Sequence, residues 1–104
     1  MRHFAYHDEL TGLSNRSLLL DRLEQTVTQS ARQPRQAALL LLDLDGFKRV
    51  NDRFGHAVGD QLLQRVVQRL LATIRKADTT SRYGGDEFII LLPDVEGETG
   101  AKSG

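Results

Sequence analysis

Four carboxylates stand in two pairs, each beside a run of apolar residues. Asp43 and Asp45 come directly after the apolar run 37–42, and Asp86 and Glu87 precede a second run at 88–92. Carboxylates that are brought close together repel one another unless protons or a cation intervene. Oxygen ligands without His or Cys suit Mg²⁺ or Mn²⁺, which leave part of their coordination shell to phosphate and water. The two pairs therefore predict a metal site that handles phosphate groups.

Ordinary structural roles for these acids stay open at this point. Asp45 precedes Gly46 and could cap a short helix, and Asp86 could simply be a hairpin residue. An EF-hand is excluded, because Lys48 stands where that loop needs glycine. The sequence has no P-loop motif, no Gly-x-Gly-x-x-Gly motif and no cysteine, and no serine stands out beside a histidine.

A predicted helix start follows the first acidic pair. The backbone N–H groups of Gly46, Phe47 and Lys48 lie in its first turn. Unpaired N–H donors and the positive end of the helix dipole can hold a phosphate there. The alternative is that Lys48 is an ordinary solvated lysine.

Length and charge limit the classes of protein to consider. The chain has 104 residues, and its 14 Lys and Arg balance 14 Asp and Glu. A neutral chain offers no broad positive surface to a nucleic-acid backbone, so we expect no nucleic-acid partner. No apolar run approaches the roughly 18–20 residues that span a bilayer, and we expect a cytoplasmic domain without a membrane segment. Residues 1–104 are predicted to form a single domain.

The elements that must position these groups can be read from the apolar periodicity. Asn15 is the expected N-cap of a helix that Pro34 stops near Arg32. A long amphipathic helix begins between 56 and 60 and ends near 77. The remaining predicted elements are a strand at 37–42 buried on both faces, a short helix at 46–54 closed by Gly55, and strands at 79–83 and 87–92.

The order of these elements predicts an α/β (α+β) fold. The connection from the first strand to the second passes through helices, which favours a parallel pair. Gly84 and Gly85 indicate a hairpin, because glycine accepts the positive φ of tight hairpin turns, and this adds an antiparallel strand. We therefore expect a mixed β-sheet with helices packed on it.

Four motifs together resemble the GGDEF domain family of diguanylate cyclases. Residues 84–88 read GGDEF, and residues 8–16 match the DxLTGLxNR opening of these domains. Residues 43–52 match DxDxFKxxND, and residues 54–60 match FGHxxGD. The four motifs occur in the family's order, and the resemblance covers about residues 5–95.

The resemblance implies a fold like that of nucleotidyl cyclases and polymerase palms. It also implies condensation of two GTP into cyclic di-GMP and two pyrophosphates, in a homodimer in which each domain holds one GTP. By the family pattern, Asp43, the Leu44 carbonyl, Asp86 and Glu87 bind Mg²⁺ or Mn²⁺. Asp86 also helps to deprotonate the 3′-hydroxyl, and Glu87 and Lys48 are assigned catalytic roles beside it. Asp45 is the weaker member of its pair.

The family pattern also assigns residues that bind substrate and product. Asn51 and Asp60 select guanine, whose adjacent N1–H and N2–H₂ donors a carboxylate can accept. Phe47, Lys48, Gly84 and Gly85 complete the predicted substrate site, the glycines by letting the nucleotide approach the backbone.

An RxxD motif lies five residues before the GGDEF signature, which is the name used below for residues 84–88. Arg75 and Asp78 form it, and in product-inhibited members this motif binds cyclic di-GMP. An arginine near a helix end followed by aspartate is also common for dipole and turn reasons.

The end of the chain departs from the family pattern. Residues 96–104 form a polar, glycine-containing tail, whereas complete GGDEF domains continue through further helices and strands. We therefore expect a truncated domain whose C-terminal part is missing, with a sensor or receiver domain upstream in the parent protein. The alternatives are a non-catalytic module that binds GTP or cyclic di-GMP, and a fragment that acts only in oligomerisation.

Overall fold

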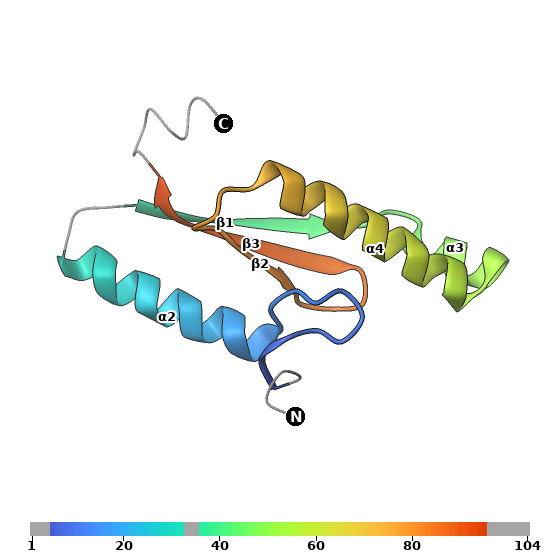
Figure 1. Cartoon of the computed structure of the whole chain (residues 1–104), viewed down its shortest axis with the longest axis horizontal. Helices are drawn as coiled ribbons and strands as arrows, with labels where there is room; N and C mark the ends of the chain where they lie inside the picture. The colour runs from blue at the N-terminus through green and yellow to red at the C-terminus, as the bar shows by residue number, and fades with distance from the viewer. Residues whose placement is uncertain (1–4, 33–35, 96–104) are drawn as a thin grey trace.

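The computed structural model describes residues 5–32 and 36–95, and it contains every element that the sequence predicts. Helix α4 ends at Thr73, four residues earlier than expected, and the last strand continues through Pro93. The predicted tail 96–104 lies outside the described residues. In chain order the elements are α2 (Arg16–Arg32), β1 (Gln36–Asp43), α3 (Phe47–Phe54), α4 (His56–Thr73), β2 (Thr79–Arg82) and β3 (Glu87–Val95) (Figure 1).

The strands form one sheet in the order β1-β3-β2, and both neighbouring pairs are antiparallel. The α/β class is confirmed, but the expected parallel pairing of β1 with β2 does not form. The two strands run in the same direction with β3 between them, because the β2–β3 hairpin turns the chain back into the space beside β1. Among the described residues, the parallel contact of this sheet is a single bridge between Ser14 and Ser81.

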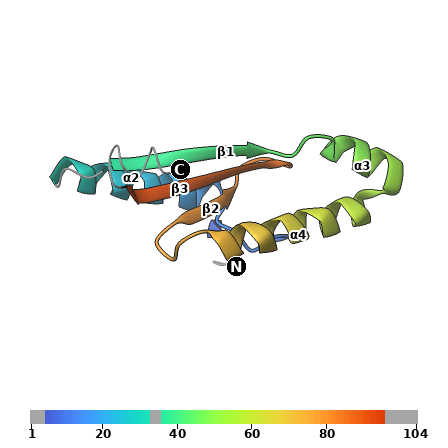
Figure 2. The same ribbon diagram turned by 90° about the horizontal axis from the view of Figure 1, so that it is seen from above.

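The core lies between the sheet and α4, which runs along one of its faces (Figure 2). Phe88 and Leu63 are its most deeply buried large side chains, at 1% and 0% exposure. Leu13, Phe47 and Val67 complete the cluster. Burying each such side chain stabilises the fold by about 1.5–3 kcal/mol. Because Leu13, Phe47 and Phe88 come from three of the four motifs, the core holds those three segments in place.

Helix α2 begins as predicted, but the apolar stripe that its period predicts, Leu19, Leu20, Leu23 and Val27, is buried only in part. The Leu18 N–H donates to Asn15 Oδ1 at 3.1 Å, so Asn15 is the N-cap. Leu19 is buried, whereas Leu20 and Val27 are 55% and 62% exposed. Thr26 takes the inward position instead, and its hydroxyl donates to the Arg22 carbonyl at 2.8 Å. That local bond lets a polar side chain be buried without an unpaired donor.

Strand β1 is not buried on both faces, in contrast to the prediction from its apolar run. It is an edge strand, and Leu41 is 74% exposed. Leu39, Leu40 and Leu42 are also exposed, at 44%, 46% and 37%. The described helices cover β2 and β3 more completely than β1, so the run of leucines has apolar surface without a partner among the described residues.

Positive φ occurs at other glycines than the sequence predicts. Gly12, Gly46 and Gly55 have φ of 76°, 77° and 94°, and each lies within one of the motifs. The predicted hairpin between β2 and β3 is confirmed, but Gly84 and Gly85 do not have the expected positive φ. The connection between β2 and β3 spans four residues, which relieves the geometric demand of a two-residue turn. None of the helices in the described ranges is long and apolar enough to cross a membrane.

Candidate metal and nucleotide site

Strand pairing brings the two acidic pairs, Asp43 with Asp45 and Asp86 with Glu87, to the same edge of the sheet. We call these two pairs the acidic corners. In the register of β1 with β3, Asp43 is directly opposite Glu87. One residue further on, the Leu44 N–H donates to the Asp86 carbonyl at 3.1 Å. Side chains of directly opposed strand residues lie on the same face of a sheet. The end of β1 and the signature hairpin therefore form one edge of the molecule.

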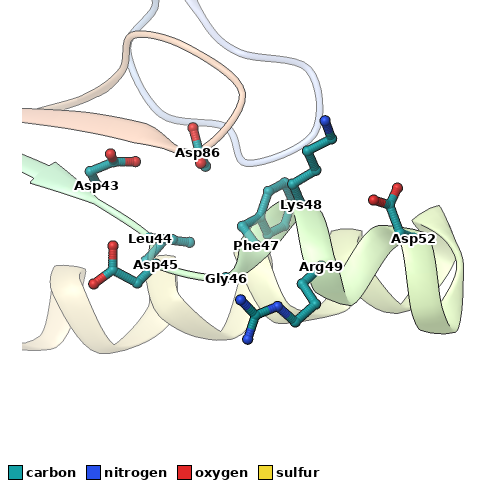
Figure 3. Close-up of a pocket in the computed structure, with 9 residues that line it drawn as sticks. All are labelled: Asp43, Leu44, Asp45, Gly46, Phe47, Lys48, Arg49, Asp52 and Asp86. Carbon is teal, nitrogen blue, oxygen red and sulfur yellow. The ribbon is translucent and has the colours of Figure 1, made fainter.

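A hollow of about 540 Å³ opens at this edge, and both acidic corners contribute to it. Asp43 and Asp86 approach it from the ends of β1 and the hairpin, and Lys48 and Arg49 project from the first turn of α3 (Figure 3). The lining residues are Asp43, Leu44, Asp45, Gly46, Phe47, Lys48, Arg49, Asp52 and Asp86. The hollow thus combines carboxylates with cationic side chains and a helix N-terminus.

Glu87 does not face this hollow. It lines a second, more apolar hollow with Tyr83 and Leu41, and Asp43 lines both hollows. Its carboxylate lies over Gly84, where a Cβ atom would overlap with it. Within 5–32 and 36–95 no three His, Cys, Asp or Glu side chains gather as a metal-binding group. Of the predicted ligands, the structure brings Asp43, Leu44 and Asp86 together, and it leaves Glu87 outside.

The carboxylates at this edge carry unbalanced charge. None of the side chains of Asp43, Asp45, Asp86 and Glu87 accepts a hydrogen bond or an ion pair from a described residue. Neighbouring negative charges without partners repel one another and attract a cation. Asp43 and Asp86 line the hollow with carboxylate oxygens, and oxygen is the ligand that Mg²⁺ and Mn²⁺ prefer. These residues therefore fit a divalent cation.

The start of α3 is free of side-chain caps. Its N-cap residue is Gly46, and no side chain bonds to the first turn, so Asp45 does not cap the helix. The Phe47 N–H donates to the Leu44 carbonyl in a long bond of 3.4 Å. The N–H groups of Gly46 and Lys48 have no partner among the residues that the structure describes. This helix terminus can therefore donate hydrogen bonds to an anion.

The predicted guanine-selecting residues occupy the neighbouring α3–α4 corner. Neither Asn51 nor Asp60 lines the hollow of Asp43 and Asp86, whereas Asp52 does. Asp60 is exposed in the first turns of α4. The Asn51 Oδ1 atom is buried without a hydrogen-bond partner and lies against Gly59. The predicted guanine-selecting residues and the predicted metal ligands therefore lie at adjacent places in the fold rather than in one hollow.

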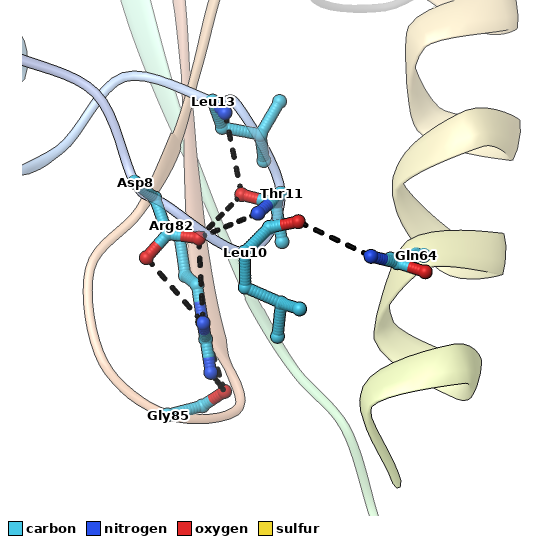
Figure 4. A network of polar contacts seen from close by, with 7 residues as sticks. All are labelled: Asp8, Leu10, Thr11, Leu13, Gln64, Arg82 and Gly85. Carbon is cyan, nitrogen blue, oxygen red and sulfur yellow. Dashed lines mark hydrogen bonds and ion pairs between the residues drawn. The ribbon is translucent and has the colours of Figure 1, made fainter. Parts of the chain in front are cut away.

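A polar network holds the signature hairpin, and sequence reasoning gave its members no role. Arg82 donates through Nη2 to the Gly85 carbonyl at 2.8 Å and forms an ion pair with Asp8 at 3.3 Å (Figure 4). Asp8 also accepts bonds from the Thr11 N–H and hydroxyl, both at 2.8 Å. Gln64 of α4 donates to the Leu10 carbonyl at 3.3 Å. The loop that contains Asp8, Leu10 and Thr11 is thereby tied to the hairpin and to α4.

The charge of Asp8 is stabilised within this network. Burial by itself raises the pKa of Asp8, but the Thr11 hydrogen bonds and the Arg82 charge outweigh it, and the pKa lies below its ordinary value. On the other side of the hairpin, Arg16 donates to the Tyr83 carbonyl at 2.9 Å and lies 4.3 Å above the Tyr83 ring. The position of Arg82 directly before the signature was the available signal for this network.

The RxxD motif lies at the far end of the β2–β3 ladder from the signature hairpin. Arg75 donates through Nη2 to Asp78 at 2.8 Å and through Nη1 to the Asp94 carbonyl at 3.0 Å. Asp78 also accepts the Arg75 N–H at 2.8 Å. The Asp78 side chain is 2% exposed, whereas that of Arg75 is 53% exposed. The turn role that the sequence left open for this pair is thus present, and one face of the guanidinium remains open.

Known proteins share this fold and these motifs. The family described as "Diguanylate cyclase, GGDEF domain" matches residues 5–103. The chain is 54% identical over 88 residues to the bifunctional diguanylate cyclase/cyclic di-GMP phosphodiesterase MucR of Pseudomonas aeruginosa, covering 85% of this chain and 13% of MucR. It is 46% identical over 99 residues to diguanylate cyclase DgcP of the same organism, covering 95% of this chain and 15% of DgcP. This chain belongs to the GGDEF domain family of diguanylate cyclases.

Solved structures agree with this assignment. The GGDEF domain of TpbB from Pseudomonas aeruginosa matches with a TM-score of 0.86 at 38% identity, over 92% of this chain and 56% of that one. The coiled coil and GGDEF domain of DgcB from Caulobacter crescentus, in complex with c-di-GMP, matches with a TM-score of 0.88 at 30% identity. That match covers 98% of this chain and 53% of DgcB. The chain thus spans little more than half of these solved chains.

Proposed function

We propose that this domain condenses two GTP molecules into cyclic di-GMP and releases two pyrophosphates. The observation that carries the proposal is the open edge at which Asp43, Asp86 and the uncapped start of α3 face one hollow. Carboxylates for a cation and N–H donors for a phosphate are what phosphoryl transfer requires of a protein. Membership in the family supports the same reaction.

A divalent cation completes this site. Asp43, Asp86 and the Leu44 carbonyl are the residues that would hold Mg²⁺ or Mn²⁺, and Glu87 joins them once its side chain turns away from Gly84. Bound there, the cation supplies charge neutralisation at the phosphates and polarisation of the α-phosphate. The unbalanced charge of the carboxylates supports this assignment.

The chain's own residues bind the phosphates and move a proton. Lys48 and the free N–H groups at the start of α3 donate to phosphate oxygens, because the helix dipole and the ammonium charge act in the same direction. Asp86 accepts the proton of the 3′-hydroxyl, which then attacks the α-phosphate of the second GTP. No described residue donates a hydrogen bond to the Asp86 carboxylate or forms an ion pair with it, so its oxygens can accept a proton.

Asn51 and Asp60 select the base from the adjacent corner. The Asp60 carboxylate accepts the N1–H and N2–H₂ donors of guanine, and adenine lacks that donor pair. Gly85 has open space where a side chain would begin, so the nucleotide can approach the backbone of the hairpin there. Phe47 contributes its backbone N–H, because its ring is buried in the core.

Condensation needs two domains, since each domain holds one GTP. The proposal therefore includes a homodimer in which two signature edges face each other. It also includes product inhibition, in which the exposed face of Arg75, supported by Asp78, binds cyclic di-GMP by phosphate contact or stacking. DgcB in complex with c-di-GMP supports recognition of this product within the family. A cytoplasmic location and an upstream sensor or receiver domain complete the proposal for the parent protein.

A second candidate is a domain that binds GTP or cyclic di-GMP without turnover. The position of Glu87 favours it, because this carboxylate lies over Gly84 and outside the hollow. The chain is also 41% identical to a protein named cyclic di-GMP phosphodiesterase NbdA, in which it covers 12% of the length. Retention of the complete signature supports the cyclase instead.

Incubation with GTP and Mg²⁺ tests the proposal directly. We expect cyclic di-GMP and pyrophosphate to appear in a ratio of one to two, and EDTA to abolish both. The experiment uses this chain beside a version extended at the C-terminus. Product from the extended version alone keeps the cyclase assignment and places the missing activity in the additional residues. No product from either version, with GTP still bound, would replace the cyclase by the binding module.

A further inference from the structure

Gly59 occupies an unusual place in the molecule, because it is a buried glycine within the first turns of α4. Glycine is among the least favourable residues in a helix, since it gives up more backbone freedom than any other residue. Glycine is usually kept where the backbone has a positive φ, and that reason does not apply here. Gly59 does not have positive φ, so alanine could adopt its backbone conformation.

The neighbour of Gly59 explains the glycine. A Cβ atom at this position would overlap with Asn51 Oδ1 and would lie 2.8 Å from Asn51 Cγ. The Oδ1 end of the Asn51 amide therefore lies against the bare Cα of Gly59, in a contact between α3 and α4. The three heavy atoms nearest to this position all belong to the Asn51 side chain.

The same contact orients the Asn51 amide. Its Oδ1 atom is buried against α4 and has no hydrogen-bond partner in the described part of the chain. Burial of an unpaired oxygen is unfavourable, so packing rather than hydrogen bonding holds this orientation.

We propose that Gly59 is a positioning residue for base recognition, whose bare Cα holds the Asn51 amide in the orientation that contacts guanine. The proposal rests on the proposed function, in which Asn51 contacts the base. In a Gly59→Ala variant, Asn51 moves instead of the helix, because its amide ends a short rotatable side chain. Affinity for guanine nucleotide is then lost without loss of the fold.

A binding experiment separates this role from a structural one. The ligand is 3′-deoxy-GTP with Mg²⁺, which lacks the attacking hydroxyl and is not consumed, and calorimetry gives its Kd. Gly59→Ala and Asn51→Ala should each weaken binding about tenfold, the typical effect of one lost hydrogen bond. The double variant should bind no more weakly than Asn51→Ala alone, since Gly59 acts through Asn51. Val58→Ala, in the same turn, should bind like the unsubstituted chain.

Thermal unfolding of the same four proteins tests the packing contact without any ligand. Removing the Asn51 side chain makes room for the new methyl group. Gly59→Ala should therefore raise Tm by roughly 4–8 °C in the Asn51→Ala background, through helix propensity alone. In the unsubstituted chain the rise should be clearly smaller, because Asn51 must be displaced.

Contrary results fall into two separate groups. Binding by Gly59→Ala like that of the unsubstituted chain, additive losses in the double variant, or equal Tm changes in both backgrounds would each overturn the role of Gly59. A chain that binds no 3′-deoxy-GTP would instead overturn the guanine site of the proposed function, and the role of Gly59 in recognition with it.

Discussion

The two ends of the β2–β3 ladder treat their acidic residues in opposite ways. At the hairpin end, the side chains of Asp86 and Asp43 have no partner among the described residues, and both border an open hollow. At the other end, the Asp78 side chain is 2% exposed and accepts bonds from the Arg75 side chain and backbone. The first arrangement leaves carboxylate charge exposed at a hollow, and the second uses an ion pair and hydrogen bonds to close a turn. The partners of an acidic residue thus indicate whether it stabilises the fold or is available to a ligand.

This difference also explains how the open end is kept in place. The carboxylates there contribute no bonds to the fold, so other residues must hold the hairpin. Arg82 binds the Gly85 carbonyl, and Arg16 binds the Tyr83 carbonyl, one arginine at each side of the loop. Asp8 fixes Arg82 in turn. Support by backbone contacts leaves the functional side chains free.

The largest expected effect comes from Asp86→Asn. Because Asp86 is proposed both to hold the cation and to accept the proton, cyclic di-GMP formation should fall by about 10³-fold or more. The Tm should not fall, since the Asp86 side chain has no partner to lose within the described residues. Product is measured by chromatography and Tm by calorimetry. Asp45→Asn is the matched control, and an equal loss in that variant would show that the hollow responds to total charge rather than to Asp86.

The next effect concerns the exposed face of Arg75. Arg75→Ala should weaken cyclic di-GMP binding by at least about tenfold, because the phosphate or guanine contact of the guanidinium is removed. Titration calorimetry with cyclic di-GMP measures it. Lys76→Ala, which removes a neighbouring charge outside the RxxD motif, serves as the control. Binding that survives Arg75→Ala would leave this end of the ladder with a structural role alone.

Removal of the buried acid should act on stability. Asp78→Ala is expected to lower the free energy of unfolding by about 1–3 kcal/mol, because the Arg75 N–H and guanidinium lose their acceptor. Urea unfolding followed by circular dichroism measures the change. Glu24→Ala, an exposed acid on α2, should change stability by less than about 0.5 kcal/mol. Equal effects of the two substitutions would show that the buried, bonded Asp78 contributes no more to stability than an exposed acid does.

The smallest effect should depend on pH. The folded pKa of Asp8 is lowered, so its charged form stabilises the fold at pH values above its unfolded pKa, and this contribution is lost as pH falls through the folded pKa. Asp8→Asn should therefore cost about 1 kcal/mol at pH 7, a modest value because the ion pair is partly exposed and screened. The difference from the unsubstituted chain should begin to shrink as pH falls through about 4, the ordinary pKa of aspartate, and should vanish only below the lower folded pKa. Urea unfolding at several pH values tests this, and a constant difference would contradict it.

Much of the local structure could be predicted because its causes are local. Asn15 caps α2, Gly55 ends α3, and each apolar period gives the predicted type of element. Predictions failed where the cause lies elsewhere in the chain. The apolar run of β1 indicated burial on both faces, but its burial depends on which elements reach the edge of the sheet. The helical crossover indicated a parallel pair, but the hairpin places β3 between β1 and β2.

In the site, too, features with local causes could be predicted and features that depend on distant segments could not. Spacing identified Asp43, Asp86 and Lys48 as neighbours at one edge, because strands that pair bring their ends together. It did not predict that Glu87 lies over Gly84, nor that Asp8 binds Arg82 across 74 residues of sequence. Side-chain direction and long-range partners depend on the packing of all neighbouring elements.

By itself, then, the sequence of this protein determined the family, the element types and the residues proposed to carry the chemistry, because motif spacing and apolar period are properties of short segments. Only the tertiary structure decided which acids stand open and which are bonded, how two arginines hold the signature hairpin, and which side chain lies against Gly59. The physical reason is that charge balance, hydrogen-bond partners and space are set by groups that meet only when distant segments pack together.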